Sequence, residues 1–226
     1  MNRRAWIAVL ALAAFAAAAP ARAQQTAPIM DKLQLADHLK SLKFGGDMRV
    51  RYDSSFKRGA GTNDRGRLRF RLRFGAEALF DHDLAAVFRL ASGTGEHSST
   101  NQSLDNAGSQ KAIWIDQAYL KWAPKFEQSS VYAQFGRAPY QFWRPYSTDM
   151  IWDDDLNPEG FHEGAEWKPA SGGLTLFIHG LQMVVDEDSN SSKNQWLFSQ
   201  VAGAEAKLPL ESRFKMQAGY HKWSDE

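Results

Sequence analysis

A row of alternating arginines is the feature of this sequence that most directly indicates chemistry. In residues 67–74, Arg-Leu-Arg-Phe-Arg-Leu-Arg-Phe, four arginines alternate with four apolar side chains. Successive side chains of a β-strand point to opposite faces, so a strand here places all four guanidinium groups on one face. Such a row creates a positive field that attracts anions. The pattern predicts a charged surface backed by an apolar one.

A second charged feature is the segment 139–159, the longest interval between the strands that we expect. It contains five aromatic and five acidic side chains: Tyr140, Phe142, Trp143, Tyr146, Trp152, Asp149, Asp153, Asp154, Asp155 and Glu159. Exposure of aromatic side chains to water is unfavourable, so we expect the segment to pack against another part of the molecule. We hypothesise that it folds inward and sets its acids opposite the arginine row, where facing charges filter solutes by size and charge. In the alternative, its aromatics cover the mouth of the structure or a subunit contact, and its acids are solvated or bind a divalent cation.

No cluster of side chains in the sequence indicates catalysis or metal binding. The segment Phe161–Gly164, Phe-His-Glu-Gly, lacks the second histidine of a zinc-protease motif, and no nucleophile-elbow or phosphate-binding glycine motif occurs. His162, His179 and His221 fall on different expected strands. We therefore expect no catalytic residue, no metal and no cofactor, although a serine and histidine brought together from separate strands would still allow a barrel lipase.

Composition excludes several classes of protein. The chain has 226 residues, no cysteine, and 27 Lys and Arg against 26 Asp and Glu. It therefore has no disulfide framework or thiolate metal site, and its balanced charge gives no support for nucleic-acid binding. The mean hydropathy is negative, which argues against a bundle of transmembrane helices.

The N-terminus has the pattern of a secretory signal peptide. Asn2-Arg3-Arg4 precedes an apolar run over residues 5–19, and Ala21-Arg22-Ala23 resembles a cleavage site. We expect cleavage after Ala23 and export of the remaining chain. Residues 24–43 then form a periplasmic N-terminal segment, in which the leucine spacing over 31–43 predicts a short helix.

From residue 44 to residue 226 the hydrophobic period is two, which predicts a β-barrel region of about nine strands. The expected strands are 46–53, 67–80, 84–91, 111–122, 130–138, 160–167, 174–185, 195–207 and 213–223. Long polar connections alternate with short turns along the chain. Outer-membrane barrels have this arrangement, with turns at the periplasmic rim and long loops outside. The sequence therefore predicts an all-β fold, a transmembrane antiparallel up-and-down barrel, with a soluble β-sheet as the alternative.

Two of the expected strands have irregular patterns. In 111–122 either register leaves an awkward residue, either Asp116 among apolar neighbours or two isoleucines on the polar face, and in 174–185 both faces are apolar. A bulge or packing against an inner loop would explain these patterns.

Energetics decides which face of the barrel meets lipid. An arginine facing lipid near the middle of the membrane costs about 2–4 kcal/mol, so the arginine face must be wet. We therefore expect seven arginines to line the lumen: Arg49, Arg51, Arg67, Arg69, Arg71, Arg73 and Arg89.

The sequence also resembles the putative-porin family of Gram-negative outer-membrane proteins. The resemblance rests on FGGDMRVRYD, RGRLRFRLRFGAEALF, WIDQAYLKWAP, FGRAPYQFW and IWDDDLNPEGFHEG, which fall within residues 33–167. It implies a diffusion pore that is monomeric or able to form a homotrimer, with outer-membrane lipid and small hydrophilic solutes as partners and no nucleic acid.

We thus expect a non-enzymatic outer-membrane porin that passes small hydrophilic solutes or ions by passive diffusion. The alternative is a non-conducting outer-membrane barrel that acts as an adhesin, an anchor or an enzyme. Because bacterial single-chain barrels have even strand numbers, nine strands predict a barrel that is incomplete at the C-terminus, an N-terminal portion of a larger porin. The sequence gives no firm ion preference, since the lumen arginines and the acidic loop oppose each other.

Overall fold

The computed structural model describes residues 37–56, 63–145, 152–170, 172–189 and 194–224. The expected signal peptide, residues 1–23, lies outside the described residues, as does the stretch 24–36. The chain divides into two compact units, Met1–Lys40 and Ser41–Glu226. Residues 37–40 are the described part of the first unit.

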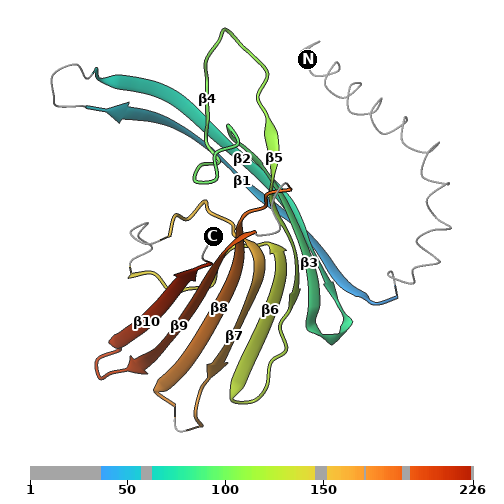
Figure 1. Cartoon of the computed structure of the whole chain (residues 1–226), viewed down its shortest axis with the longest axis vertical. Helices are drawn as coiled ribbons and strands as arrows, with labels where there is room; N and C mark the ends of the chain where they lie inside the picture. Colours follow the sequence, from blue (N-terminus) through green and yellow to red (C-terminus); the bar gives the residue numbers. More distant parts are fainter. Residues whose placement is uncertain (1–36, 57–62, 146–151, 171, 190–193, 225–226) are drawn as a thin grey trace, which may run out of the picture. The chain divides into compact units, whose positions relative to one another are not determined.

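One antiparallel sheet contains nearly all the regular structure of the described residues (Figure 1). Its strands are β1 (Leu39–Ser55), β2 (Arg65–Phe80), β3 (Leu84–Ser92), β4 (Gln102–Ser103), β5 (Ile113–Trp122), β6 (Ser129–Arg137), β7 (Glu159–Trp167), β8 (Leu174–Asp186), β9 (Gln195–Lys207) and β10 (Arg213–Trp223). Apart from β4, which pairs with β2, the strands are neighbours in chain order from β1 to β10. This confirms the predicted all-β, up-and-down fold.

Within the described residues, no helix is long and apolar enough to span a membrane.

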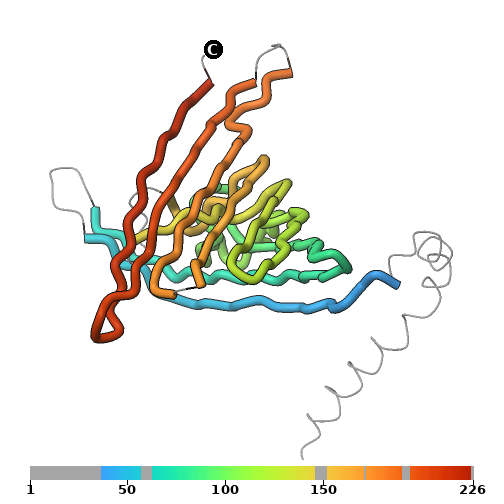
Figure 2. The backbone as a smooth tube through the Cα atoms, turned by 90° about the horizontal axis from the view of Figure 1, so that it is seen from below, coloured from blue at the N-terminus to red at the C-terminus, as the bar shows by residue number. Residues whose placement is uncertain are grey.

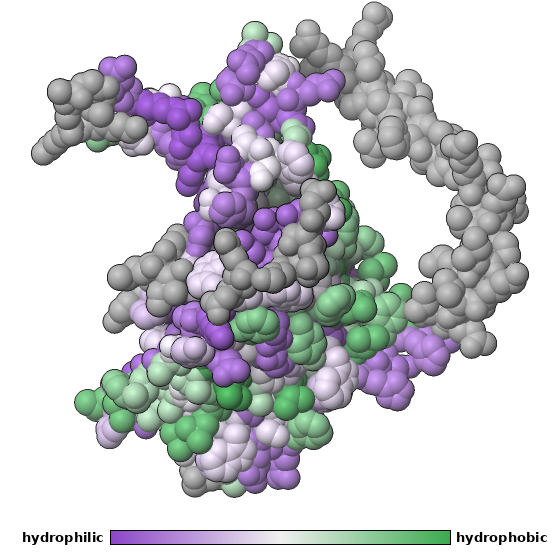
Figure 3. Space-filling model, in the orientation of Figure 1, coloured by the Kyte–Doolittle hydropathy of each residue, from purple (hydrophilic) through white to green (hydrophobic). Residues whose placement is uncertain are grey.

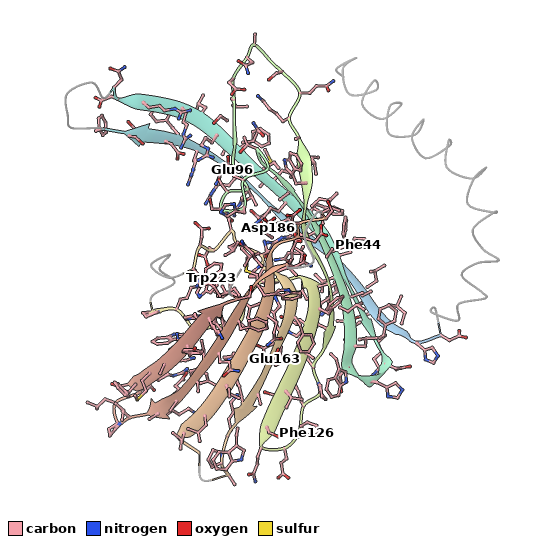
Figure 4. All side chains as sticks on the ribbon, in the orientation of Figure 1. Phe44, Glu96, Phe126, Glu163, Asp186 and Trp223 are labelled. Atoms are coloured by element: carbon pink, nitrogen blue, oxygen red, sulfur yellow. The ribbon has the colours of Figure 1, made fainter. Side chains whose placement is uncertain are left out.

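The connections alternate in length, as the sequence predicts. Short connections follow β2, β5, β7 and β9, and longer ones follow β1, β3, β6 and β8. Because neighbouring strands are antiparallel, all the short connections lie at one end of the strands and all the long ones at the other end. Figure 4 shows Phe126, in the short β5–β6 connection, at the opposite end of the strands from Glu96, in the long β3–β5 connection.

The register of the sheet defines two faces with opposite polarity. Residues opposite each other in register share a face, so Gln134, His162, Leu181, Ser199 and His221 form one row across β6 to β10. The register continues this face through β5 and β3 to the arginines of β2. We call it the inner face and the opposite one the outer face.

Polarity is inverted relative to a water-soluble sheet. Many outer-face apolar side chains are exposed, with Met48 at 71%, Phe135 at 67% and Phe214 at 55% relative accessibility. On the inner face, polar side chains are buried, with Gln134 at 1% and Ser199 at 0%. In the view of Figure 3, hydrophilic surface gathers over the upper ends of β1 and β2 and hydrophobic surface over the lower strands. A soluble sheet would bury its apolar side chains and expose its polar ones.

The expected helix over 31–43 is wrong at its C-terminal end. β1 already begins at Leu39, so residues 39–43 are extended, and residues 31–36 lie outside the described part of the chain. β2 is 16 residues long and is the neighbour of β1 in the sheet. Backbone pairing along such a long neighbour outweighs the weak helical preference of a short leucine-spaced segment.

Candidate functional site

The seven arginines expected to line a lumen all lie on the inner face at the β1–β3 side of the sheet. We call them the arginine strip: Arg49, Arg51, Arg67, Arg69, Arg71, Arg73 and Arg89. Strict alternation along β2 places four of them in one row, and β1 and β3 add the others from both sides. The strip is held together by carboxylates of the same face.

Asp47 of β1 joins two neighbouring arginines of β2. Its carboxylate lies 2.7 Å from Nη2 of Arg71 and 2.7 Å from Nε of Arg73. One carboxylate thus pairs with two guanidinium groups and fixes the orientation of both.

Asp53, further along β1, also joins neighbouring arginines. Its carboxylate lies 2.7 Å from Arg51 Nε, 3.2 Å from Arg69 Nη1 and 3.6 Å from Arg67 Nε. A single carboxylate therefore stands among three arginines.

Arg89 of β3 pairs with Asp116 at a β-bulge. The register between β3 and β5 shifts after Arg89, and the extra residue in β5 is Asp116. The bulge turns the carboxylate of Asp116 toward the inner face, where it lies 2.5 Å from Arg89 Nε with only 4% of its side chain exposed. The bulge explains the irregular pattern that the sequence shows in 111–122.

The described parts of the segment between β6 and β7, residues 138–145 and 152–158, lie against this inner face; we call them the inner loop. At its C-terminal end, Asn157 Nδ2 donates to Asp116 Oδ1 and its Oδ1 accepts from Gln117 Nε2, both at 2.9 Å. At the base, Ala138 N donates to Pro158 O at 3.1 Å. Asn157 is 2% exposed, so this polar anchor is buried.

Glycines allow the strands to meet closely where the inner loop leaves the sheet. Gly136 of β6 and Gly160 of β7 face each other in register and have φ angles of +121° and +153°. A Cβ would lie 2.3 Å from Ala118 O at Gly136 and 1.9 Å from Gln182 O at Gly160. Any other residue at either position would push the strands apart.

The other end of the inner loop is anchored by apolar packing against β8, β9 and β10. Phe142 is 7% exposed and forms a buried cluster with Leu181 and Val201. Gln217 Nε2 of β10 donates to the carbonyl of Trp143 at 2.8 Å. The loop thus contacts both β5 and β10, and Figure 2 shows its yellow trace inside the bend of the sheet.

This cluster also explains why both faces of β8 are apolar. Leu181 is fully buried beneath the loop, and Phe177 is 6% exposed, whereas Ile178 on the outer face is 55% exposed. On the inner face of β8, Leu181 and Met183 pack against the cluster around Phe142, whereas the outer-face residues point away from the loop.

The comparison with protein families gives the same classification as the geometry. A family model described as putative porin matches residues 58–225, most of the chain. The chain belongs to this porin family. A search of curated proteins found no match.

The structure separates the acidic residues that were expected to face the arginine strip of this porin-family chain. Among the described acids of the loop, Asp155 alone lies within ion-pair distance of the strip, 3.9 Å from Arg73 Nη1. Asp154 instead pairs with Arg144 inside the loop, and Asp153 Oδ1 accepts a hydrogen bond from the backbone of Asp155 at 2.8 Å.

The two remaining acids of the expected set are Glu159 and Asp149. Glu159 is the first residue of β7, 63% exposed at its side chain, and it pairs with Arg137 at 2.9 Å. Asp149 lies outside the described residues. The hypothesis that a ring of loop acids faces the arginines is therefore corrected for Asp154 and Glu159, because local arginines bind their carboxylates.

A second connection also contacts the arginine strip, which the sequence reasoning missed. In the β3–β5 connection, Asn101 Oδ1 accepts from Arg49 Nη2 at 2.8 Å, and Asn101 O and Ser99 Oγ accept from Arg69 Nη2 at 3.1 and 3.3 Å. Thr100 N donates to Asp155 Oδ2 at 3.4 Å, which links this connection to the inner loop. Serine, threonine and asparagine are common in any exposed loop, so their types gave no signal.

Two of the three histidines singled out in the sequence, His179 and His221, lie beside Phe142. The rings of His179 and His221 lie with centroids 6.5 Å from that of Phe142, and Tyr132 bonds His179 Nδ1 at 3.0 Å. Among the described residues, no group of three His, Cys, Asp or Glu side chains is placed to hold a metal ion.

Proposed function

We propose that this chain forms the wall of a water-filled outer-membrane channel that passes small hydrophilic solutes or ions by passive diffusion. The inverted polarity of the sheet carries the proposal. Exposed apolar residues on the outer face fit a lipid environment, and a buried, charged inner face fits an aqueous lumen. If the inner face were turned toward lipid instead, each arginine of the strip near the middle of the membrane would cost about 2–4 kcal/mol.

Export to the outer membrane is part of the proposal. The apolar run and small-residue site at residues 1–23 support a signal peptide cleaved after Ala23. The family supports the same location. Lipid would then cover the outer-face side chains, whose exposure to water would be unfavourable.

The inner loop has the position required to narrow such a channel. Its described residues are held on the inner face by a polar anchor at Asn157 and an apolar anchor at Phe142. Beside it, a cavity of about 750 Å³ is lined by both loop and wall, including Thr100, Asp116 and Asp155. The loop therefore reduces the space on the inner face without filling it.

Electrical and osmotic measurements distinguish a channel from a non-conducting barrel that acts as an adhesin, an anchor or an enzyme. In planar bilayers we expect discrete steps of ionic current, and in liposome swelling we expect entry of monosaccharides. A large dextran, too wide for a narrowed lumen, is the control and should cause no swelling. Absence of current and swelling from membranes that demonstrably contain the inserted protein would overturn the channel and leave the non-conducting barrel.

A further inference from the structure

We infer that the arginine strip contains a binding site for oxyanions, centred on Arg49, that makes the channel prefer anionic solutes. The preference in transport rests on the proposed function, whereas the binding site itself rests on the geometry of β1, β2 and the β3–β5 connection. Three observations support the site: the excess of positive charge, the contacts of Arg49 and the partners of the nearby acids.

The strip has more positive than negative charge. Six of its seven arginines, all but Arg49, lie within ion-pair distance of four carboxylates, those of Asp47, Asp53, Asp116 and Asp155. Seven positive and four negative charges leave an excess of three positive charges within the strip and the carboxylates that pair with it. A partly buried surface with such an excess attracts anions more strongly than a solvated one, because water screens it less.

Arg49 is the least neutralised member of the strip. No carboxylate of the described residues lies within 4.0 Å of its guanidinium group, whose Nη2 donates to the neutral amide oxygen of Asn101. Its Nε is buried and has no acceptor. The positive charges of Arg71, Arg51 and Arg73 act on it, and among carboxylates Asp155 exerts the opposing effect.

The surrounding donors match an anion with several oxygens. Arg69, whose side chain is 12% exposed, also has a buried Nε without an acceptor. Its Nη2 donates to the backbone oxygen of Asn101, the residue whose side-chain Oδ1 accepts from Arg49. Phosphate, sulfate and carboxylate groups accept several N–H bonds from guanidinium groups at once. Chloride has the charge but cannot span two donor groups in the same way.

Apart from Asp155, which also lies 3.9 Å from Arg73, the nearby acids pair with cations other than Arg49. Asp47 is shared by two arginines and Asp53 by three. In the inner loop, Asp154 pairs with Arg144, and at its end Glu159 pairs with Arg137. The sequence alone leaves open whether arginines or acids dominate the charge here. At this site the arginines dominate, and the net charge is positive.

Calorimetric titration of inorganic phosphate into the detergent-solubilised protein tests the site without requiring conduction. We expect saturable binding, weakened about tenfold or more by Arg49→Gln, since hydrogen bonds to charged groups contribute this much. Lys168→Gln is the matched control, because it also removes one positive charge. Lys168 is exposed, pairs with Glu166 and lies at the end of the strands where the short connections are, so its substitution should leave phosphate binding unchanged. No saturable binding, or equal weakening by both substitutions, would overturn the site.

Reversal potentials in a potassium chloride gradient test the consequence for transport. We expect chloride to be more permeant than potassium, phosphate to reduce the chloride current saturably, and Arg49→Gln to reduce both effects. Cation preference in a conducting channel would overturn the inferred selectivity while leaving the channel intact. Phosphate binding without any current would instead contradict the proposed channel and support the binding site.

Discussion

Replacing Arg89 by methionine is expected to lower the free energy of unfolding by about 3–5 kcal/mol, the usual cost of removing one partner of a buried ion pair. Asp116 is 4% exposed and lies 2.5 Å from Arg89 Nε. Without the arginine, its carboxylate would remain buried beside Asn157, which satisfies one oxygen but carries no charge. Denaturant unfolding of the membrane-inserted protein, followed by tryptophan fluorescence, measures this loss.

A matched arginine on β10 controls for the loss of a charge. Arg213 is exposed and lies 3.5 Å from Glu205, which has a second cation, Lys215, at 3.4 Å. Arg213→Met is therefore expected to change stability by at most about 1 kcal/mol. The double variant Arg89→Met, Asp116→Leu should recover part of the loss, since it removes the buried charge as well. Equal effects of the two single substitutions would contradict the buried pair.

The second large effect is expected at the apolar anchor of the inner loop. Phe142→Ala removes a side chain that is 7% exposed and packs against Leu181 and Val201. Truncation of a buried phenylalanine costs about 3–5 kcal/mol, enough to shift the balance between anchored and released loop by about 100-fold or more. If the loop narrows the channel, its release raises the single-channel conductance and increases current noise.

Gln141 provides the control for this experiment. It neighbours Phe142 in the loop, but its side chain is exposed and bonds Pro139 O within the loop itself. Gln141→Ala should leave the conductance at the wild-type value. A Phe142→Ala channel with unchanged conductance would show that the loop does not restrict the path of ions.

The strands were predictable because their pattern is local and repeated. The expected strand 213–223 matches β10, and 195–207 matches β9, residue for residue. In both, outer-face and inner-face side chains alternate with a period of two, and short polar turns mark the ends. The irregular pattern around Asp116 was also informative, since the structure shows a bulge there, one of the two explanations that the pattern left open.

The contacts between loops were not predictable from the sequence. The position of Asn101 at the arginine strip depends on how the β3–β5 connection folds back beside β2, where β4 pairs with Arg69 and Phe70. Likewise, the partner of Glu159 follows from the register of β6 and β7, which places Arg137 opposite it. The strand at Leu39 depends on a neighbour far along the chain, which local leucine spacing cannot reveal.

Thiol labelling at two adjacent residues of β2 tests most directly whether the inner face lines water and the outer face meets lipid. The chain has no cysteine, so each introduced thiol is the sole site of reaction. Arg71 is on the inner face and Leu72, 44% exposed, is on the outer face near the middle of β2. The proposed channel predicts that a charged, water-soluble thiol reagent labels Arg71→Cys in membranes and alters its current, but leaves Leu72→Cys unmodified. Rapid labelling of Leu72→Cys, or no labelling of Arg71→Cys, would contradict the proposed channel wall.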